Sequence, residues 1–496
     1  MAASIIQSVG HAGGEGDPLV DPQQLDRRLR EIATKLADGG DGGLFEKVEA
    51  FLLGILMGNQ TLRVGVFRLV EAYPALRLPE TTLDRIVEEL GGASSPRIVR
   101  WLVHLATVIP GGAWLARGIS SFGISATAKR FIAGRDADDA LAVLRELWKN
   151  GTGVIVDALG EKTVTSGESD HYAARVLDLV ERLGTEARSW PSQPRQEHDH
   201  HGAVPRVAVA IKPTALSPKF APVTRQRGIN DVATRLGPIL AAAADHGVFV
   251  WFDMEQHAVK DMTHELFRSL VDTVPSAPVG IVLQAYLRDS YDDLCSLIEW
   301  SEARVASGGT PIGIRLVKGA YWDHETVIAR QNDWPVPVFQ QKWASDSNYD
   351  RCAILMNERA DVIRPAFASH NLRSLAHAIG HAELVGLPRE AIEVEVLHGM
   401  AGTLPTALGA YGVRTRVYVP IGELVPGMSY LVRRLLENTS NESFLRQQDV
   451  GGQDLGALLD APPALSSADP LPTDMAHLFA GSQTSQTSKA ASEVDA

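Results

Sequence analysis

The spacing of apolar residues changes once along the chain, near residue 151. Before that point, apolar residues recur three and four positions apart in segments separated by Gly or Pro, which is the pattern of amphipathic helices. These segments cover residues 25–38, 44–58, 61–73, 81–92 and 136–150. The pattern predicts an all-helical N-terminal region over residues 26–128, preceded by a Gly-rich, disordered stretch over residues 1–25.

After residue 151, eight short apolar runs alternate with longer helix-like stretches. The runs start near residues 153, 206, 247, 280, 311, 364, 392 and 413. Runs that are apolar at almost every position are typical of parallel strands buried on both faces. Eight strand–helix units within about 290 residues favour a (β/α)8 barrel, whose usual length is about 250 residues.

An open, doubly wound sheet is the alternative to a barrel. None of the eight runs, however, is followed by the G-x-G-x-x-G pattern of a dinucleotide-binding fold. We therefore expect an α/β protein with a (β/α)8 barrel over residues 129–445. A tail rich in Pro, Ser and Thr over residues 461–496 predicts disorder.

Composition narrows the class of protein. Hydrophobic residues make up 45% of the chain and charged residues 22%, as in soluble globular proteins. The net charge of −13 argues against a nucleic-acid-binding surface. Cys295 and Cys352 are too few for a disulfide framework or a cysteine-rich metal site. The His-rich run at residues 198–201 is expected to lie in a polar connector and to bind no metal.

The chain shows no segment that targets or spans a membrane. Its first residues lack the basic region and the apolar core of a secretory signal. The most apolar stretch, residues 101–116, contains His104 and Pro110 and is too short and too interrupted to cross a bilayer. We expect a cytoplasmic protein, with peripheral contact at the inner face of the membrane left open.

Polar side chains stand at the ends of all eight predicted strands. In a (β/α)8 barrel these ends meet at one face, where active sites lie. Any one of the residues could serve only as a helix cap, but Arg315 lies within a buried run, where an unpaired charge costs several kcal/mol. We predict that together they line a catalytic mouth. They are Asp157, Glu161, Lys212, Asp253, Gln284, Arg315, Lys318, Ser369, His370, Asn371, His398 and Tyr418.

A helix-like segment after the eighth run carries four polar residues on one face. Tyr430, Arg433, Arg434 and Glu437 fall at positions i, i+3, i+4 and i+7. Two adjacent guanidinium groups match the oxygens of a carboxylate ligand, which lysine does not do in the same way. The alternative is a solvated helix face on which Arg433 pairs with Glu437.

Several motifs carry a resemblance to a known family. They are FDM at residues 252–254, LQAY at 283–286, RLVKGAYW at 315–322, LHGM at 397–400 and YLVRRLLEN at 430–438. In order and spacing they resemble proline dehydrogenase, above all the proline-oxidising portion of the bifunctional proline utilization A proteins. The likeness runs from about Arg130 to Phe444, and residues 58–76 resemble the helical region before the barrel in those proteins.

The resemblance implies a distorted (β/α)8 barrel that uses FAD to oxidise L-proline to Δ1-pyrroline-5-carboxylate and passes electrons to a membrane quinone. It implies that Asp253 and Arg315 are catalytic, with Arg315 facing N5 of the flavin. The residues implied to bind substrate are Lys212, Tyr321, Leu397, Tyr418, Arg433 and Arg434.

The resemblance also assigns the cofactor site and a gate. The residues implied to contact FAD are Met254, Gln284, Arg315, Lys318, Gly319, Ala320, Trp322, Ser369 and His370. Glu161 would pair with the clamp arginines in a closed site, and Tyr430 and Glu437 would support the clamp helix. The chain departs from the family pattern at Glu395-Val396, where members often carry a glutamine.

The sequence shows neither an aldehyde dehydrogenase half with a cysteine nucleophile nor a DNA-binding ribbon. A separate glutamate-semialdehyde dehydrogenase is therefore an expected partner, unless the chain is the proline-oxidising half of a bifunctional enzyme. Three other readings are a Schiff-base lyase that uses Lys212 or Lys318, a barrel without catalytic activity, and a transcriptional repressor.

Overall fold

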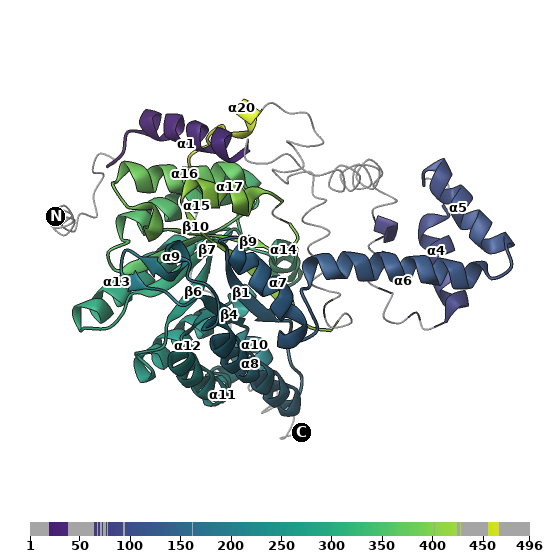
Figure 1. The fold of residues 1–496 in the computed structure, drawn as a ribbon, viewed down its shortest axis with the longest axis horizontal. Helices are drawn as coiled ribbons and strands as arrows, with labels where there is room; N and C mark the ends of the chain where they lie inside the picture. Colours follow the sequence, from purple (N-terminus) through teal and green to yellow (C-terminus); the bar gives the residue numbers. More distant parts are fainter. Residues whose placement is uncertain are drawn as a thin grey trace, which may run out of the picture.

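A closed barrel of eight parallel strands forms the centre of the molecule (Figure 1). The strands are β1 (Gly153–Ala158), β4 (Val207–Ile211), β5 (Val248–Phe252), β6 (Val279–Gln284), β7 (Ile312–Val317), β8 (Ile363–Ala368), β9 (Glu393–Leu397) and β10 (Arg414–Ile421). Each pairs with its neighbour in chain order, and β10 pairs with β1 to close the barrel. All eight start within one residue of the predicted positions, so the barrel is confirmed and the open sheet is excluded.

The computed structural model describes most of the chain from residue 78 to residue 423 and shorter pieces on either side. The described residues are 19–37, 64–66, 68–69, 72, 76, 78–92, 95–160, 162–400, 402–423, 427 and 455–465. The predicted helix over residues 44–58 and the predicted clamp helix lie outside them.

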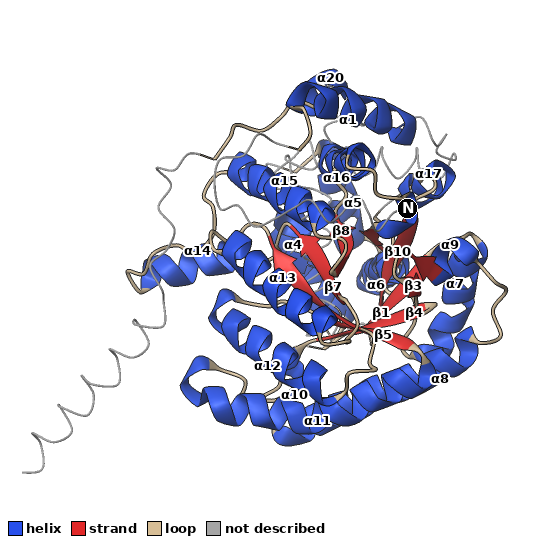
Figure 2. Cartoon of the chain, turned by 90° about the vertical axis from the view of Figure 1, so that its left-hand side faces the viewer, coloured by secondary structure: helices blue, strands red, loops and turns tan. Residues whose placement is uncertain are grey.

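Helices surround the barrel on its outer face (Figure 2). The longer ones are α7 (Ala137–Lys149), α8 (Ser166–Ala187), α11 (Arg225–His246), α12 (Lys260–Thr273), α13 (Ser290–Ala306), α14 (Trp322–Gln331), α15 (Lys342–Glu358), α16 (Leu372–Leu384) and α17 (Leu404–Tyr411). Strand β5, with the sequence VFVWF, is buried at every position, as expected for a strand covered by helices outside and by side chains within. Residue Thr165 begins α8 with a capping box that it forms with Glu168.

Helix α1 (Pro22–Ala37) belongs to the outer layer of the barrel. It packs on α16 and α17 and buries Leu29, Ile32 and Leu36. Its Arg28 donates to Glu383 of α16 at 2.7 Å. The prediction of disorder is therefore wrong for residues 22–25, because this helix gains a packing partner far away in the sequence.

Three further helices form an arm that extends away from the barrel (Figure 1). They are α4 (Pro79–Leu90), α5 (Arg97–Val108) and α6 (Gly112–Phe131). Their contact is a small cluster centred on Ile86, Val103 and Ala116. Helices α5 and α6 lie within the predicted all-helical region but were not predicted as separate segments. The apolar residues of α6 follow no clear amphipathic period, whereas those of α5 do. Among the helices of the described residues, none is long and apolar enough to cross a membrane.

Candidate active site at the carboxyl mouth of the barrel

One ammonium group lies among two carboxylates and a phenol at the carboxyl ends of neighbouring strands. The Nζ of Lys212, which follows β4, lies 2.7 Å from Asp157 Oδ1 at the end of β1 and 3.1 Å from Asp253 Oδ2 after β5. It also donates to the hydroxyl of Tyr418 on β10 at 3.4 Å, and that hydroxyl donates to Asp253 Oδ2 at 2.8 Å. Strands β10, β1, β4 and β5 are consecutive neighbours in the closed barrel, and this order brings the four residues together.

Arg315 connects this group to the other half of the mouth. It projects from β7 and is only 3% exposed. Its Nη1 lies 3.1 Å from Asp253 Oδ1, and its Nε lies 2.5 Å from Glu395 Oε2. Its guanidinium carbon stands over the ring of Trp251 at 4.4 Å and near that of Tyr418 at 5.5 Å. The side chains of Asp253 and Glu395 and two aromatic faces thus hold a buried cation at one place.

The pKa of Lys212 depends on two opposing effects, burial and the charges of its neighbours. Burial by itself would lower the pKa of Lys212, but Asp157, Tyr418 and Asp253 together raise it well above its usual value. Burial also raises the pKa of the Tyr418 phenol well above its usual range. Lys212 is therefore an ammonium and Tyr418 a neutral hydroxyl at neutral pH.

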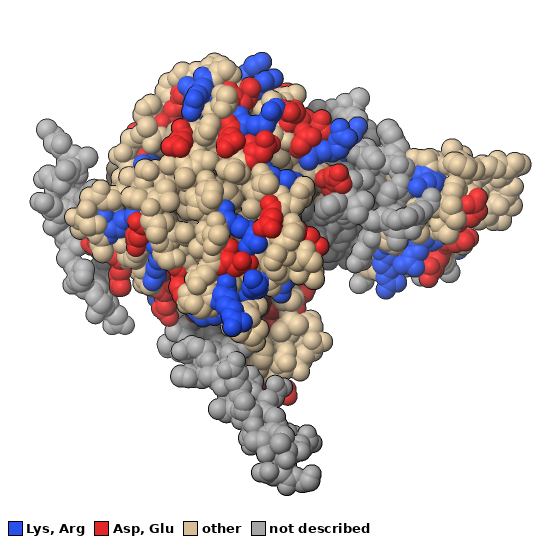
Figure 3. All heavy atoms as spheres, turned by 90° about the horizontal axis from the view of Figure 1, so that it is seen from below, with Lys and Arg blue, Asp and Glu red and all other residues tan. Residues whose placement is uncertain are grey.

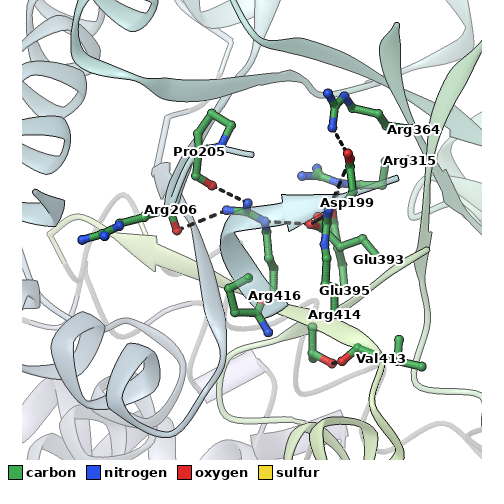
Figure 4. A network of polar contacts seen from close by, with 12 residues as sticks. Asp199, Pro205, Arg206, Arg315, Arg364, Glu393, Glu395, Val413, Arg414 and Arg416 are labelled. Carbon is green, nitrogen blue, oxygen red and sulfur yellow. Dashed lines mark hydrogen bonds and ion pairs between the residues drawn. The ribbon is translucent and has the colours of Figure 1, made fainter. Parts of the chain in front are cut away.

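Two glutamates at positions i and i+2 of β9 point into the barrel. Glu393 contacts Arg414 and Arg416 of β10, the latter at 2.8 Å, and Figure 4 shows both guanidinium groups turned toward it. These arginines hold the pKa of Glu393 at about 2 against the effect of burial. Burial raises the pKa of Glu395 to about 8, and the Glu393 charge adds to this effect while Arg315 opposes it. At neutral pH the pair therefore shares one proton, held on Glu395.

The charges continue from the mouth to the opposite end of the barrel. Arg414 also lies near Asp199, and Asp199 pairs with Arg364 of β8 (Figure 4). Asp199 belongs to a short hairpin of β2 (His198–Asp199) and β3 (Gly202–Ala203). The barrel interior, which in most such folds is filled by branched aliphatic residues, here contains a continuous series of ion pairs.

Most of the residues expected to contact FAD lie on or directly after three consecutive strands, β6 to β8. Gln284 ends β6, Lys318 and Gly319 follow β7, and Ser369 and His370 follow β8. The Nε2 of Gln284 donates to the carbonyl of Glu255 at 3.2 Å, and the amide of Leu397 donates to His370 Nε2 at 3.0 Å.

Gly319 has a φ of +129°, and a Cβ there would lie 2.4 Å from the ring of Tyr286. Only glycine can therefore occupy this position without displacing that ring.

Several buried polar atoms on this side of the mouth have no hydrogen-bond partner among the described residues. Among them are Oε1 of Gln284, an acceptor, and Nη2 of Arg315, a donor. Buried polar atoms of this kind cost free energy unless water or a ligand pairs with them. An isoalloxazine ring offers both an N–H donor and carbonyl and ring-nitrogen acceptors, so the residues present fit a flavin.

The remaining residues of the expected site divide into two groups. Met254 is buried after β5, Trp322 donates its indole N–H to the carbonyl of Phe339 at 2.8 Å, and Ala320 and Tyr321 lie in the loop between β7 and α14. Outside the described residues lie Glu161, Tyr430, Arg433, Arg434 and Glu437, so the predicted clamp and gate stay predictions.

Sequence analysis gave no site role to Trp251 or Glu395, and it placed Asp157 in the predicted mouth without naming a partner for it. Asp157 was recognised as a strand end, but its contact with Lys212 depends on which strands are neighbours. Glu395 had a readable signal, because acids at i and i+2 of β9 face arginines at i and i+2 of β10. In the barrel register, Glu393 lies opposite Arg414 and Glu395 opposite Arg416.

The fold and this mouth together define a (β/α)8-barrel protein with the charge arrangement of a small-molecule enzyme. A family model described as proline dehydrogenase matches residues 140–447 of the chain. The match covers more than half of the 496 residues, so the chain belongs to the proline dehydrogenase family.

Named relatives show the same likeness. The bifunctional protein PutA of Klebsiella aerogenes is 27% identical over 381 residues, which are 74% of this chain and 26% of that protein. The proline dehydrogenase of Deinococcus radiodurans is 28% identical over 320 residues, which are 64% of this chain and 89% of that protein. This chain thus spans about a quarter of the length of its bifunctional relatives.

A solved structure agrees with the sequence comparisons. Proline utilization A from Bdellovibrio bacteriovorus, inactivated by N-propargylglycine, superposes with a TM-score of 0.77 at 37% identity. The superposition covers 91% of this chain and 44% of that one. The likeness therefore extends beyond the barrel.

Proposed function

We propose that this chain oxidises L-proline to Δ1-pyrroline-5-carboxylate with FAD as its cofactor. The observation that carries the proposal is the position of Asp253, whose two oxygens hold Lys212 on one side and Arg315 on the other. A cation for a substrate carboxylate and a cation for a flavin thus stand side by side. Membership of the proline dehydrogenase family supports this reading.

In the proposed site the substrate lies on β10, β1, β4 and β5. The Lys212 ammonium has three hydrogens, which point to Asp157, Asp253 and Tyr418. The contact to Tyr418 is the longest, so the proline carboxylate would take that hydrogen and leave the two carboxylates in place. Arg433 and Arg434 would add the planar donors of a carboxylate clamp, while Tyr321, Leu397 and Tyr418 would surround the ring.

The cofactor lies on β6 to β8 in this proposal, where Arg315 and Gln284 would pair their buried atoms with the flavin ring. FAD, when bound, accepts a hydride from the carbon next to the ring nitrogen of proline. Arg315 would hold positive charge beside the flavin, and Trp251 below it would keep the guanidinium in place. The substrate nitrogen must be neutral for this reaction, so turnover should rise as the proline amine loses its proton.

We further propose a membrane quinone as electron acceptor, a separate glutamate-semialdehyde dehydrogenase as consumer of the product, and a cytoplasmic location. The Schiff-base alternative receives no support at Lys212. Its raised pKa keeps the amine protonated, and a protonated amine cannot attack a carbonyl.

The absorption spectrum of the purified full chain tests the proposal directly. We expect oxidised flavin bands that bleach when L-proline is added without oxygen and that stay unchanged with D-proline. A colourless protein, or flavin bands that L-proline leaves intact, would contradict it. Trapping of a keto acid on Lys212 by borohydride would favour the lyase instead.

A further inference from the structure

Glu395 is a buried acid that contacts the cation proposed to face the flavin. It is 2% exposed, and its Oε2 lies 2.5 Å from Nε of Arg315. On the face of the molecule shown in Figure 3, acidic and basic side chains lie intermixed at the surface, where water solvates each charge. Glu395 is shut off from bulk water, so its ionisation depends on the few side chains that face it.

Arg315 lies between two acids, and one of its donor groups is left over. Oδ1 of Asp253 lies 3.1 Å from Nη1, and the guanidinium carbon stands 4.4 Å from the ring centre of Trp251. Nη2 is buried and has no hydrogen-bond partner among the described residues. Burial lowers the pKa of Arg315, but the charges of Glu395 and Asp253 outweigh it, so the guanidinium stays a cation. The net charge that a ligand meets at Nη2 therefore depends on whether the two acids are ionised.

The two acids differ in how firmly their charge is held. Oδ2 of Asp253 also accepts hydrogen bonds from Lys212 at 3.1 Å and from Tyr418 at 2.8 Å. Glu395 contacts Arg315 through Oε2, while its Oε1 is buried and has no hydrogen-bond partner among the described residues. Protonation of Asp253 would disturb three donors at once, whereas protonation of Glu395 concerns Arg315 alone. Glu395 is thus the acid beside Arg315 whose charge can change.

Further charged and titratable groups face Glu395 from the neighbouring elements. Glu393, two residues earlier on β9, is ionised because the arginines of β10 hold its pKa at about 2 (Figure 4). Arg416 lies opposite Glu395 in the register of β9 and β10, and the paired position on β8 is an uncharged alanine. The phenol of Tyr349 on α15 stays neutral, because burial raises its pKa well above the usual range. Burial raises the pKa of Glu395 to about 8, an effect that Glu393 increases and the nearby arginines oppose.

We propose that, in the flavin site proposed above, Glu395 acts through Arg315 as a positioning residue that sets the positive charge presented to the cofactor. With its proton, Glu395 leaves that charge to the flavin, whose reduced form is an anion in alkaline solution. Without its proton, Glu395 shares the guanidinium with Asp253, and the flavin becomes harder to reduce. By linkage, Glu395 takes a proton from solvent when the flavin holds two electrons and a negative charge, and it returns that proton when the electrons leave.

The midpoint potential of the bound flavin, measured against pH with redox dyes, tests the proposal on the full chain. In the unchanged chain the potential should fall up to about twice as steeply just above pH 8 as just below it, because a proton on Glu395 then joins the one that the flavin takes up. The Glu395→Gln variant keeps an acceptor for Arg315 and cannot ionise, so its slope should not change near pH 8. At about pH 9, an indicator dye should show that reduction takes up fewer protons in the variant than in the unchanged chain.

The matched control is Glu390→Gln, which removes the same charge from an exposed position on the connection before β9. Its potential should follow that of the unchanged chain at every pH, and circular dichroism should show that both variants are folded. With flavin bound, a single slope in the unchanged chain, or a bend that persists in Glu395→Gln, would overturn this role of Glu395 and leave the proposed function standing. Loss of flavin in that variant alone would assign Glu395 to cofactor binding instead. An unchanged chain that binds no flavin would overturn both proposals.

Discussion

Asp253 is the residue on which the charges of the mouth converge. Its Oδ2 accepts hydrogen bonds from Lys212 and Tyr418, and its Oδ1 accepts one from Arg315. A carboxylate with both oxygens engaged has little freedom to rotate, so it fixes the separation of the two cations. In the proposed site, that separation would decide where a substrate carboxylate can lie relative to the flavin.

Glu395 makes the stability of the fold depend on pH. Its pKa in the folded chain is about 8, against about 4.5 when it is exposed, so between these values the folded state holds a proton that the unfolded state has lost. Stability should therefore fall as pH rises from 5 to 8. The Glu395→Gln variant keeps the shape without the titration and should lose this part of the slope, as measured by urea unfolding at several pH values.

Glu390→Gln is the control for this measurement, because Glu390 is exposed on the same connection before β9. It should leave the slope as it is. Parallel stability curves for the unchanged chain and the Glu395 variant would show that Glu395 ionises normally despite its burial. Glu393 does not confuse the result, since its pKa lies near 2 in the fold and it is ionised in both states above pH 5.

The residues of the site could be found from the sequence as strand ends, but their contacts could not. Lys212, Asp253, Arg315 and Tyr418 each stand at a position that barrel architecture alone marks as functional. Which carboxylate neutralises which cation depends on side-chain reach across the barrel. The sequence does not show which side chains meet across the barrel. For this reason Asp157 was named without a partner.

At the scale of the element, the clamp hypothesis depends on the helix predicted over residues 430–437. The Arg434→Met variant keeps the length and helix propensity of the side chain and removes its two-pronged donor. Its KM for L-proline should rise about a hundredfold or more, because a charged, two-point contact contributes about 3 kcal/mol or more. Flavin absorbance should stay unchanged. Steady-state kinetics with an artificial acceptor would measure the effect.

Arg446→Met is a suitable control for the clamp. Arg446 is not one of the four residues of the predicted face, and its substitution removes the same charge. An unchanged KM in the Arg434 variant, or an equal rise in both variants, would remove the clamp from the site. Loss of flavin absorbance in the Arg434 variant would place this helix on the cofactor and not on the substrate.

Elements were predictable where their apolar pattern had one period. Strands buried on both faces and helices buried on one face gave clear patterns, and α7 was found within one residue of its first and last positions. The apolar residues of α6 follow no single helical period, so this helix was not predicted as a separate segment. Helix α1 was recognised as a helix, but its place on α16 and α17 depends on residues about 350 positions away, such as Glu383.

At the scale of the whole molecule, the proposed cofactor should stabilise the fold, because it would pair with buried polar atoms of Gln284 on β6 and Arg315 on β7 that have no partner among the described residues. Removal of FAD should lower the melting temperature of the chain. FAD added back at about one hundred times its Kd should restore about 2.7 kcal/mol. NAD, which shares the adenine dinucleotide but lacks the isoalloxazine ring, is the control in the same thermal scan. Equal shifts with FAD and NAD, or no shift with FAD, would contradict a flavin site.

The series of ions inside the barrel has a consequence for how this family can vary. Aliphatic side chains in a barrel interior can repack when a neighbour loses a methyl group. A buried guanidinium that loses its carboxylate partner keeps its charge, and repacking of the neighbours does not compensate for it. We therefore expect a substitution at Arg414, Arg416 or Glu393 to be accompanied by a compensating substitution on the adjacent strand. In an alignment of homologous chains, these three positions should covary, while positions in the surrounding loops should vary independently of one another.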